Sequence, residues 1–396
     1  MIRHWLNLAR CLMLGLSALS LAVYAAGDPI RIGLNLEIGD VSSTSDDAIR
    51  LGVEEAVAEI NRAGGVLGGR QLAVAVTDNR SVPARGVRNL HALAADQDVV
   101  AVMVGKFSPL ALEVVKELPA LRIPLLDPWA AADGIINNGQ SPNWAFRLSL
   151  SDSMAVAAVL RHARERGLRR IGVLLPNIAW GRSNDEALKA RVGNSGVSIT
   201  ATEWYNWGGE AGLMQRYVAL RQSGAQAIFL VANEREGAQF VRELAELPES
   251  QRLPIISHWG VTGGDFWRMC GPALQQVDFV VVQTYSFGGA RNDRARALAR
   301  RAQAVFAAGS PESIPSPVGV AHAYDMTHLL ARAIDKAGSS RREDVRQALE
   351  SLGPYDGVVK HFQRPFSPAN HEALNENDLF FSRYQADGRL VRIRKP

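Results

Sequence analysis

The feature that most constrains this sequence is a regular alternation of apolar segments with amphipathic helical segments from residue 30 to residue 352. Continuous apolar runs such as VVAVMVG at 99–105 are typical of strands buried on both faces. Apolar residues recur at helical spacing in the segments between them, as in DDAIRLGVEEAVAEINRA at 46–63. The alternation predicts an α/β fold with doubly wound parallel sheets.

The predicted elements fill most of the chain. Strands are expected at 30–37, 71–77, 99–105, 123–128, 170–176, 197–205, 227–232, 254–259 and 277–287. Helices are expected at 46–63, 83–96, 108–119, 152–166, 183–194, 211–223, 235–246, 291–308, 319–337 and 341–352. After Gly353 the helical rhythm is absent, and a few short strands are expected. The length therefore fits two doubly wound parallel-sheet lobes with about six strands each.

Composition narrows the classes of function. The 396 residues are 47% hydrophobic and 21% charged, which fits one large or two medium globular domains. The formal net charge is +4, and Arg3 and Arg10 supply two of these charges. This balance gives no reason to expect nucleic acid or an anionic membrane as a partner. After residue 25 the only cysteine is Cys270, so an intrachain disulfide is excluded.

The N-terminal segment MIRHWLNLARCLMLGLSALSLAVYAA has the pattern of a secretory signal peptide. Arg3 and Arg10 give a positive start, residues 11–23 are apolar, and Val23 and Ala25 suit a signal peptidase. We expect residues 1–25 to be a signal peptide and the mature protein to be periplasmic. An uncleaved membrane anchor is the alternative interpretation, although the apolar run is short for a span.

The stretch EINRAGGVLGGRQL at 59–72 is close to a phosphate-binding loop, but its chemistry differs. Arg70 and Gln71 stand where such a loop needs Lys and a Ser or Thr, and the stretch closes a helix instead of opening one. We interpret Gly64 and Gly65 as a helix stop. The sequence has neither an H-E-x-x-H nor a G-x-S-x-G motif, so we expect no cofactor, no metal and no enzymatic activity.

Several segments together resemble one known family. They are the run from Ala48 to Gly105, IPLLDPWAAAD, FRLSLSDSMAVAAVL, RIGVLLPNIAWG and AHAYDMTHLLARAIDKAG. In this order they resemble the periplasmic leucine/isoleucine/valine-binding proteins, the type I solute-binding proteins of ABC transporters. The resemblance implies two lobes joined by three hinge crossings, with a ligand between them. By that pattern, lobe one holds 28–147 plus 287–353, and lobe two holds 148–282 plus 354–396.

Loops after the strands of the first lobe supply one set of candidate ligand contacts, because ligands bind beyond the carboxyl ends of such strands. Ser43 and Thr44 belong to a cluster of hydroxyls that either forms a polar pocket or caps the next helix. By resemblance, Ser108 binds a ligand carboxylate, although it also suits a helix N-cap. By resemblance, the backbone of Trp129, Ala130 and Ala131 lines the ligand. Amino-acid binders often have Thr at about residue 131, so Ala131 argues against an ordinary α-amino acid.

The second lobe and the hinges supply the remaining candidates. By resemblance, Trp180 forms an aromatic wall, and Glu236 or Glu234 pairs with a ligand ammonium, while a first-turn helix acid is the alternative. Further candidates in loops or at the hinges are Asn233, Trp259, Tyr285 and Tyr324. Tryptophans in loops predict a ligand with a flat or apolar body and at least one polar end.

The resemblance therefore implies a monomeric solute-binding protein. It would capture an amino acid, an aromatic acid or an amide by closure of its lobes, and deliver it to an ABC permease. The alternative is a ligand-sensing periplasmic module that docks on a membrane receptor or a two-component system.

Overall fold

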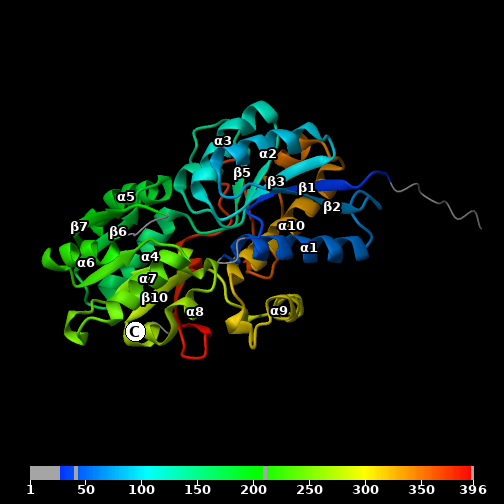
Figure 1. The fold of residues 1–396 in the computed structure, drawn as a ribbon. Coiled ribbons are helices and arrows are strands. Elements are labelled where there is room, and N and C mark those ends of the chain that lie inside the picture. Colours follow the sequence, from blue (N-terminus) through cyan, green and yellow to red (C-terminus); the bar gives the residue numbers. More distant parts are fainter. Residues whose placement is uncertain (1–26, 40–42, 208–211, 394–396) are drawn as a thin grey trace, which may run out of the picture.

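The computed structural model describes residues 27–39, 43–207 and 212–393. Figure 1 shows two α/β bodies side by side, one mostly blue to cyan and the other mostly green. This arrangement confirms the predicted fold class of two doubly wound lobes. The predicted signal peptide lies outside the described residues. Within the described residues, no helix is both long and apolar enough to cross a membrane.

The first sheet has five strands in the order β2-β1-β3-β4-β5, all of them parallel. Its strands are β1 (Ile30–Leu36), β2 (Leu72–Asp78), β3 (Val99–Val104), β4 (Leu125–Asp127) and β5 (Ala145–Arg147). Its helices are α1 (Ser45–Arg62), α2 (Pro83–Ala95), α3 (Ser108–Leu121), α10 (Pro317–Ala337) and α11 (Arg342–Leu349). The helices α2 and α3 share one core cluster with β3, whereas α1 and α10 belong to the larger cluster on the other face.

The second sheet has seven strands in the order β14-β13-β10-β9-β8-β6-β7. They are β6 (Arg170–Pro176), β7 (Ser198–Tyr205), β8 (Ala227–Leu230), β9 (Ile255–Ser257), β10 (Phe279–Gln283), β13 (Phe380–Tyr384) and β14 (Leu390–Arg392). The strands β13 and β14 are antiparallel additions to an otherwise parallel sheet. Its helices are α4 (Asp152–Glu165), α5 (Ala179–Arg191), α6 (Leu213–Gln222), α7 (Glu234–Ala245) and α8 (Phe266–Cys270).

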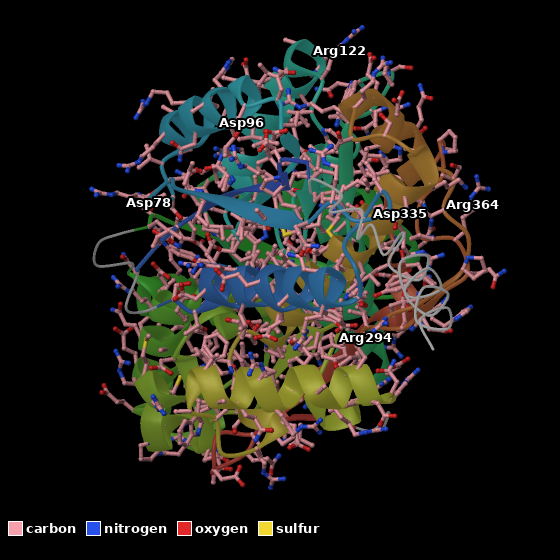
Figure 2. All side chains as sticks on the ribbon, turned by 90° about the vertical axis from the view of Figure 1, so that its right-hand side faces the viewer. Asp78, Asp96, Arg122, Arg294, Asp335 and Arg364 are labelled. Atoms are coloured by element: carbon pink, nitrogen blue, oxygen red, sulfur yellow. The ribbon has the colours of Figure 1, made fainter. Side chains whose placement is uncertain are left out.

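Three segments carry the chain between the two sheets, at 148–151, 284–292 and 373–379. After the second crossing, α9 (Asp293–Phe306) runs beside α1, and Arg294 pairs with Glu59. Figure 2 shows these two helices alongside each other, with Arg294 labelled between them.

The segment before the third crossing lies against the first sheet. It contains the short strands β11 (Tyr355–Asp356) and β12 (His361–Phe362). The Arg147 backbone N–H donates to the carbonyl of His371 at 2.9 Å, and Asp325 of α10 accepts two backbone N–H groups of this segment. The lobe boundaries drawn from the sequence stay predictions, and these contacts favour a return to the second lobe after 372 instead of at 354.

Most expected elements are present within a few residues. The helix expected at 46–63 is α1, and it ends where Gly64 and Gly65 take positive φ values of 111° and 77°. The Gly65 N–H donates to the carbonyl of Ile60 at 3.0 Å, which satisfies a helix-end acceptor. The glycine-rich stretch therefore connects α1 to β2, as predicted. The three-residue strand β5 had no counterpart among the expected elements.

Candidate binding site between the two lobes

A small cavity lies where loops of both lobes meet. Its volume is about 20 Å³, which is room for roughly one water molecule. The loops that follow β3, β4, β6, β7, β8 and β9 supply its lining, so it sits beyond the carboxyl ends of strands from both sheets. The lining residues are Lys106, Phe107, Ser108, Pro109, Trp129, Ala131, Ile178, Trp180, Trp207, Asn233, Trp259 and Gly260.

Aromatic pairs that join the lobes form much of the cavity wall. Trp129 follows β4 and lies against Trp259, which follows β9, with ring centroids 5.4 Å apart. Phe107 and Trp207 stack at the same centroid distance with an interplanar angle of 24°. Each pair takes one ring from each lobe. Closure of the lobes therefore buries four flat apolar surfaces around one small space.

An ion pair also crosses between the lobes beside this cavity, and of its two residues only Lys106 belongs to the cavity lining. Lys106 follows β3, and its Nζ lies 3.0 Å from Oε1 of Glu234, the first residue of α7. The two side chains are only 10% and 4% exposed. Lys106 Nζ also donates to Ser43 Oγ, whereas the buried Glu234 Oε2 has no hydrogen-bond partner in the structure. The chain thus supplies its own cation to a buried carboxylate.

Glu236, two residues along α7, is half-buried, and like Glu234 it is not among the residues that line the cavity. Burial raises the pKa of its carboxyl, and the nearby charge of Glu234 raises it further, while Lys106 opposes the shift. Of the two acids proposed for a ligand ammonium, Glu234 is therefore the one with its charge at the lobe interface, and it is already paired.

Trp180 is fixed by a buried polar cluster. Its indole N–H donates to Asp152 Oδ1 at 3.0 Å, and His258 Nε2 lies 3.1 Å from the same oxygen without the alignment of a hydrogen bond. His258 Nδ1 accepts from the backbone N–H of Trp259 at 2.9 Å, which places the imidazole proton on Nε2. Asp152 and His258 are fully buried. They hold Trp180 and Trp259 in place and leave neither ring nitrogen of His258 open to the cavity.

Ser43 and Thr44 hold the two lobes together. The Thr44 backbone N–H and the Ser43 hydroxyl both donate to the carbonyl of Gly263, at 2.7 and 3.1 Å. Thr44 also shares a hydrogen bond of 2.8 Å with Ser316. Thr44 occupies the N-cap position of α1, but its side chain makes no capping bond. Neither residue lines the small cavity.

Ser108 organises the loop that carries Trp129. Its hydroxyl accepts from the backbone N–H groups of Ala131 and Ala132, at 3.2 and 3.3 Å. The Ala130 N–H is taken up by Asp127 Oδ1 at 2.7 Å. Because Ser108 accepts two hydrogen bonds, its own hydroxyl proton is free to point into the cavity.

The structure brings together six of the thirteen proposed contacts at the cavity lining, namely Ser108, Trp129, Ala131, Trp180, Asn233 and Trp259. Tyr285 and Tyr324 lie elsewhere. Tyr285 lines a separate pocket of about 360 Å³, and the Tyr324 hydroxyl donates to Glu59 on α1. The sequence reasoning missed Lys106, Phe107 and Trp207. The first two stand directly before Ser108 in GKFS, immediately after a strand, and that position was the available signal.

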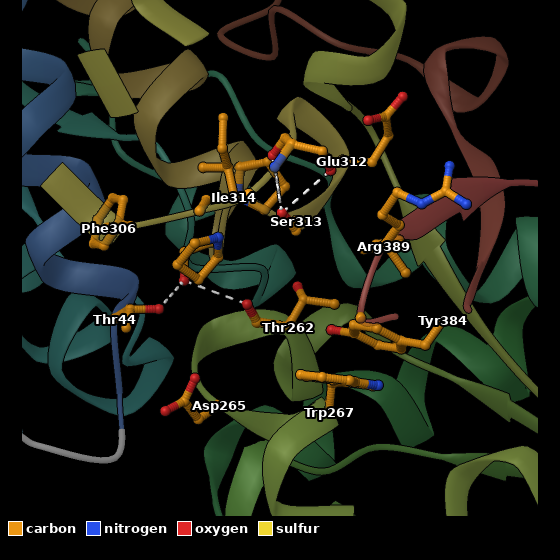
Figure 3. A pocket seen from close by; sticks show the side chains of 18 of the residues that line it. Thr44, Thr262, Asp265, Trp267, Phe306, Glu312, Ser313, Ile314, Tyr384 and Arg389 are labelled. Carbon is orange, nitrogen blue, oxygen red and sulfur yellow. Dashed lines mark hydrogen bonds between the residues drawn. The ribbon is translucent and has the colours of Figure 1, made fainter. Parts of the chain in front are cut away.

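A larger pocket of about 630 Å³ opens beside the contacts of Thr44 (Figure 3). Figure 3 shows Trp267, Tyr384 and Arg389 on one side and Phe306 and Ile314 on the other. Its walls come from the loop between α9 and α10, the turn between β13 and β14, and the segment after β9. Because it lies away from most of the strand ends, we regard the smaller cavity as the candidate site.

No group of three or more His, Cys, Asp or Glu side chains within the described residues is arranged to hold a metal ion. Cys270 is buried, and burial raises the pKa of its thiol to about 12. That environment disfavours the thiolate that a nucleophile needs.

Comparison with known proteins gives consistent matches over nearly the whole chain. A family model described as periplasmic binding protein matches residues 29–389. The Leu/Ile/Val-binding protein homolog 1 of Brucella suis biovar 1 is 22% identical over 337 residues, covering 83% of this chain and 84% of the relative. A type 1 periplasmic binding protein from Bordetella pertussis Tohama I has a TM-score of 0.82 at 22% identity, covering 92% of this chain and 100% of that chain.

A second solved structure is similar at lower identity. It is a solute binding protein of an ABC transporter from Rhodopseudomonas palustris BisB5 in complex with 3,4-dihydroxy benzoic acid. It has a TM-score of 0.75 at 15% identity and covers 93% of this chain and 99% of its own. At these identities the solved structures support the fold, including the pairing of two α/β lobes.

Proposed function

Because the chain belongs to the periplasmic binding protein family, we propose that it captures a small molecule between its lobes and delivers it to an ABC permease. The observation that carries this proposal is the cavity lined by strand-end loops of both lobes. A ligand held there touches both lobes only when they are closed. Its contact free energy therefore favours the closed form, which is the shape that a permease would recognise.

Ligand entry requires the lobes to separate. A cavity of about 20 Å³ admits roughly one water molecule, so the conformation described is closed too tightly for a solute. The ligand would enter an open form and would part the aromatic rings that now touch across the interface. Moving such an equilibrium from 1:99 to 99:1 takes a preference of about 10⁴-fold for the closed form.

The lining indicates a ligand with a flat or apolar body and a polar end. Four tryptophans and Phe107 would bury the body, while Lys106 and Ser108 offer hydrogen-bond donors. The names of the similar proteins include both aliphatic amino acids and a dihydroxylated aromatic acid. We propose an amino acid, an aromatic acid or an amide as the class of ligand.

The remaining parts of the proposal follow from a role in capture. We propose that residues 1–25 direct export and are removed, and that the mature chain acts in the periplasm as a monomer without catalysing a reaction. Ser108, Trp129, Ala131, Trp180, Asn233 and Trp259 would contact the ligand directly, with Lys106, Phe107 and Trp207 beside them.

Native mass spectrometry of residues 26–396 tests capture, because it weighs any compound retained through purification. Titration calorimetry should then give the affinity of that compound, or of aromatic acids, amides and amino acids supplied singly. We expect Trp129→Ala and Trp207→Ala each to weaken binding about tenfold or more. Trp267→Ala, in the larger pocket, is the matched control and should leave the affinity unchanged. Weakened binding in Trp267→Ala alone would move the site to the larger pocket.

A further inference from the structure

We propose that Lys106 acts as a built-in counter-ion for Glu234, so that the site selects ligands bringing an uncharged N–H or O–H donor and rejects those bringing an ammonium there. This inference rests on the proposed function, because it assigns the chemistry of the ligand end that would approach Glu234, the partner of the cavity-lining Lys106. It makes Lys106 a specificity-determining residue of the binding site.

The first step concerns charge. A carboxylate that is 4% exposed needs a cation nearby, since an uncompensated buried charge is strongly destabilising. Lys106 Nζ provides that cation from the opposite lobe, 3.0 Å from Glu234 Oε1. The pair is neutral as a whole before any ligand arrives. A ligand therefore need not bring a positive charge to make closure favourable.

The second step concerns the remaining oxygen. Glu234 Oε2 is buried and has no hydrogen-bond partner. A buried acceptor without a donor is costly, so this oxygen favours a ligand that can donate to it. A hydroxyl or an amide N–H would satisfy the oxygen and leave the charge balance unchanged. An ammonium would place a second cation on the same carboxylate, next to Lys106 Nζ, and like charges so close are strongly disfavoured.

The third step is that Lys106 cannot easily move aside. Its backbone N–H donates to Asp46 Oδ1 at 3.0 Å, and its Nζ donates to Ser43 Oγ. The preceding residue is Gly105, where a methyl group would lie 2.0 Å from Asp46 Oδ2. The backbone is thus packed directly on the Asp46 carboxylate at the start of α1. An incoming ammonium would have to break these contacts to displace the lysine.

Ligands that differ only at the donor provide the test. Titration calorimetry would compare 3-phenyllactate with phenylalanine, 2-hydroxy-4-methylpentanoate with leucine, and phenylacetamide with 2-phenylethylammonium. Each pair exchanges an uncharged donor for an ammonium on a similar body. The proteins are the wild type, Lys106→Met, and Lys116→Met as a control at an exposed lysine on α3.

We expect the wild type and Lys116→Met to bind the uncharged-donor members about tenfold or more tightly than the ammonium members. Lys106→Met should lose or invert that preference, because Glu234 then lacks a cation. Equal or tighter binding of the ammonium members by the wild type would overturn the inference. So would an unchanged preference in Lys106→Met.

Two further outcomes separate this inference from the proposed function. Binding of none of the six compounds by any variant would overturn the proposed ligand class, and this inference with it. Binding that Trp207→Ala leaves intact would contradict the proposed site, whatever the donor preference. If Lys106→Met does not fold, Lys106→Gln takes its place, and the wild-type comparison remains decisive by itself.

Discussion

Asp127, at the end of β4, shows how one buried side chain sets the position of the cavity wall. Its Oδ1 accepts the backbone N–H groups of Trp129 and Ala130, at 3.0 and 2.7 Å, and so turns the chain after the strand. Its Oδ2 is buried without a partner. Burial raises the pKa of Asp127 to about 7, although the charge of Arg147 and the two N–H groups oppose the shift.

This raised pKa makes stability depend on pH. Between about pH 4 and pH 7 the folded protein keeps a proton on Asp127 that the unfolded chain releases. The contribution of Asp127 to the free energy of unfolding therefore falls as pH rises. Asp127→Asn keeps the accepting oxygen but cannot ionise. We expect its free energy of unfolding, relative to wild type, to rise by about 2 kcal/mol or more from pH 4 to pH 8 in urea titrations.

The control for this measurement is Asp293→Asn, which changes a fully exposed side chain on α9. A difference between Asp127→Asn and wild type that stays constant over the pH range would contradict the assigned cause. The same result would mean that Asp127 is ionised in the folded protein at pH 4.

The sequence predicts that a residue belongs to the site when its position depends only on the end of one strand. Trp129, Trp180 and Trp259 follow strands, and all three reach the cavity. The partner of each residue could not be predicted, because it depends on which loop of the other lobe lies opposite. Glu234 was proposed as a contact for a ligand cation, yet its partner is Lys106, 128 positions earlier in the chain.

At the scale of elements, α1 and α10 pack against each other unusually closely. Gly52 of α1 has no side chain, and a methyl group there would lie 2.3 Å from the carbonyl oxygen of Val320 on α10. We expect Gly52→Ala to lower the free energy of unfolding by about 2 kcal/mol or more, because the helices must move apart.

The matched substitution is Gly193→Ala, since a methyl group at Gly193 would meet no atom within 4 Å outside its own stretch of backbone. Denaturant unfolding of both variants would check the prediction. Equal stability of the two would show that the contact between α1 and α10 relaxes without cost.

The ion pair between Arg147 and Glu372 ties the segment before the third crossing to β5. Arg147 is fully buried, and it also donates to the carbonyl oxygens of Ala130 and Ala132. Glu372→Gln removes the carboxylate charge that pairs directly with this guanidinium, so we expect a loss of about 3 kcal/mol in the free energy of unfolding. Arg191 pairs with Glu376 at a more exposed position, and Glu376→Gln should cost less than about 1 kcal/mol.

Elements differ in how well the sequence predicts them. Long periodic segments such as α1 and α9 lie within two residues of their expected bounds. The helix expected at 183–194 begins four residues earlier, at Ala179, because Gly181 allows the first turn to press on Pro176. The strand β5 has three residues, which is too short for a periodicity to appear.

At the scale of the whole molecule, contacts within the protein hold the lobes closed. The Lys106–Glu234 pair and the bonds from Ser43 and Thr44 to Gly263 all cross between them. In the Lys106→Met variant, water can hydrate the Glu234 carboxylate only if the two lobes separate. We expect the ratio of open to closed molecules to rise about 100-fold. This change corresponds to about 3 kcal/mol, the cost of breaking a buried ion pair.

Small-angle scattering of the ligand-free protein would check this shift as a larger radius of gyration in Lys106→Met than in wild type. Lys116→Met serves as the control. Identical scattering curves for wild type and Lys106→Met would show that the pair does not govern closure.

The pairing of two doubly wound lobes was predictable because the alternation of elements runs along the whole chain. The degree of closure was not, because it depends on contacts between residues far apart in sequence, such as Ser43 with Gly263. Sequence periodicity reports which face of each element is buried, and carries no information about the angle between two bodies.

The order of strands in the second sheet also bears on how the protein is made. The strand β10 pairs with β13. Nearly a hundred residues separate these two strands in the sequence, and many of them pack against the first sheet. A chain that lacked the residues from β13 up to Arg392 would leave β10 without its two antiparallel neighbours at that edge of the sheet. The second sheet is therefore not built from one continuous stretch of the sequence, and its full set of strands requires the C-terminal segment.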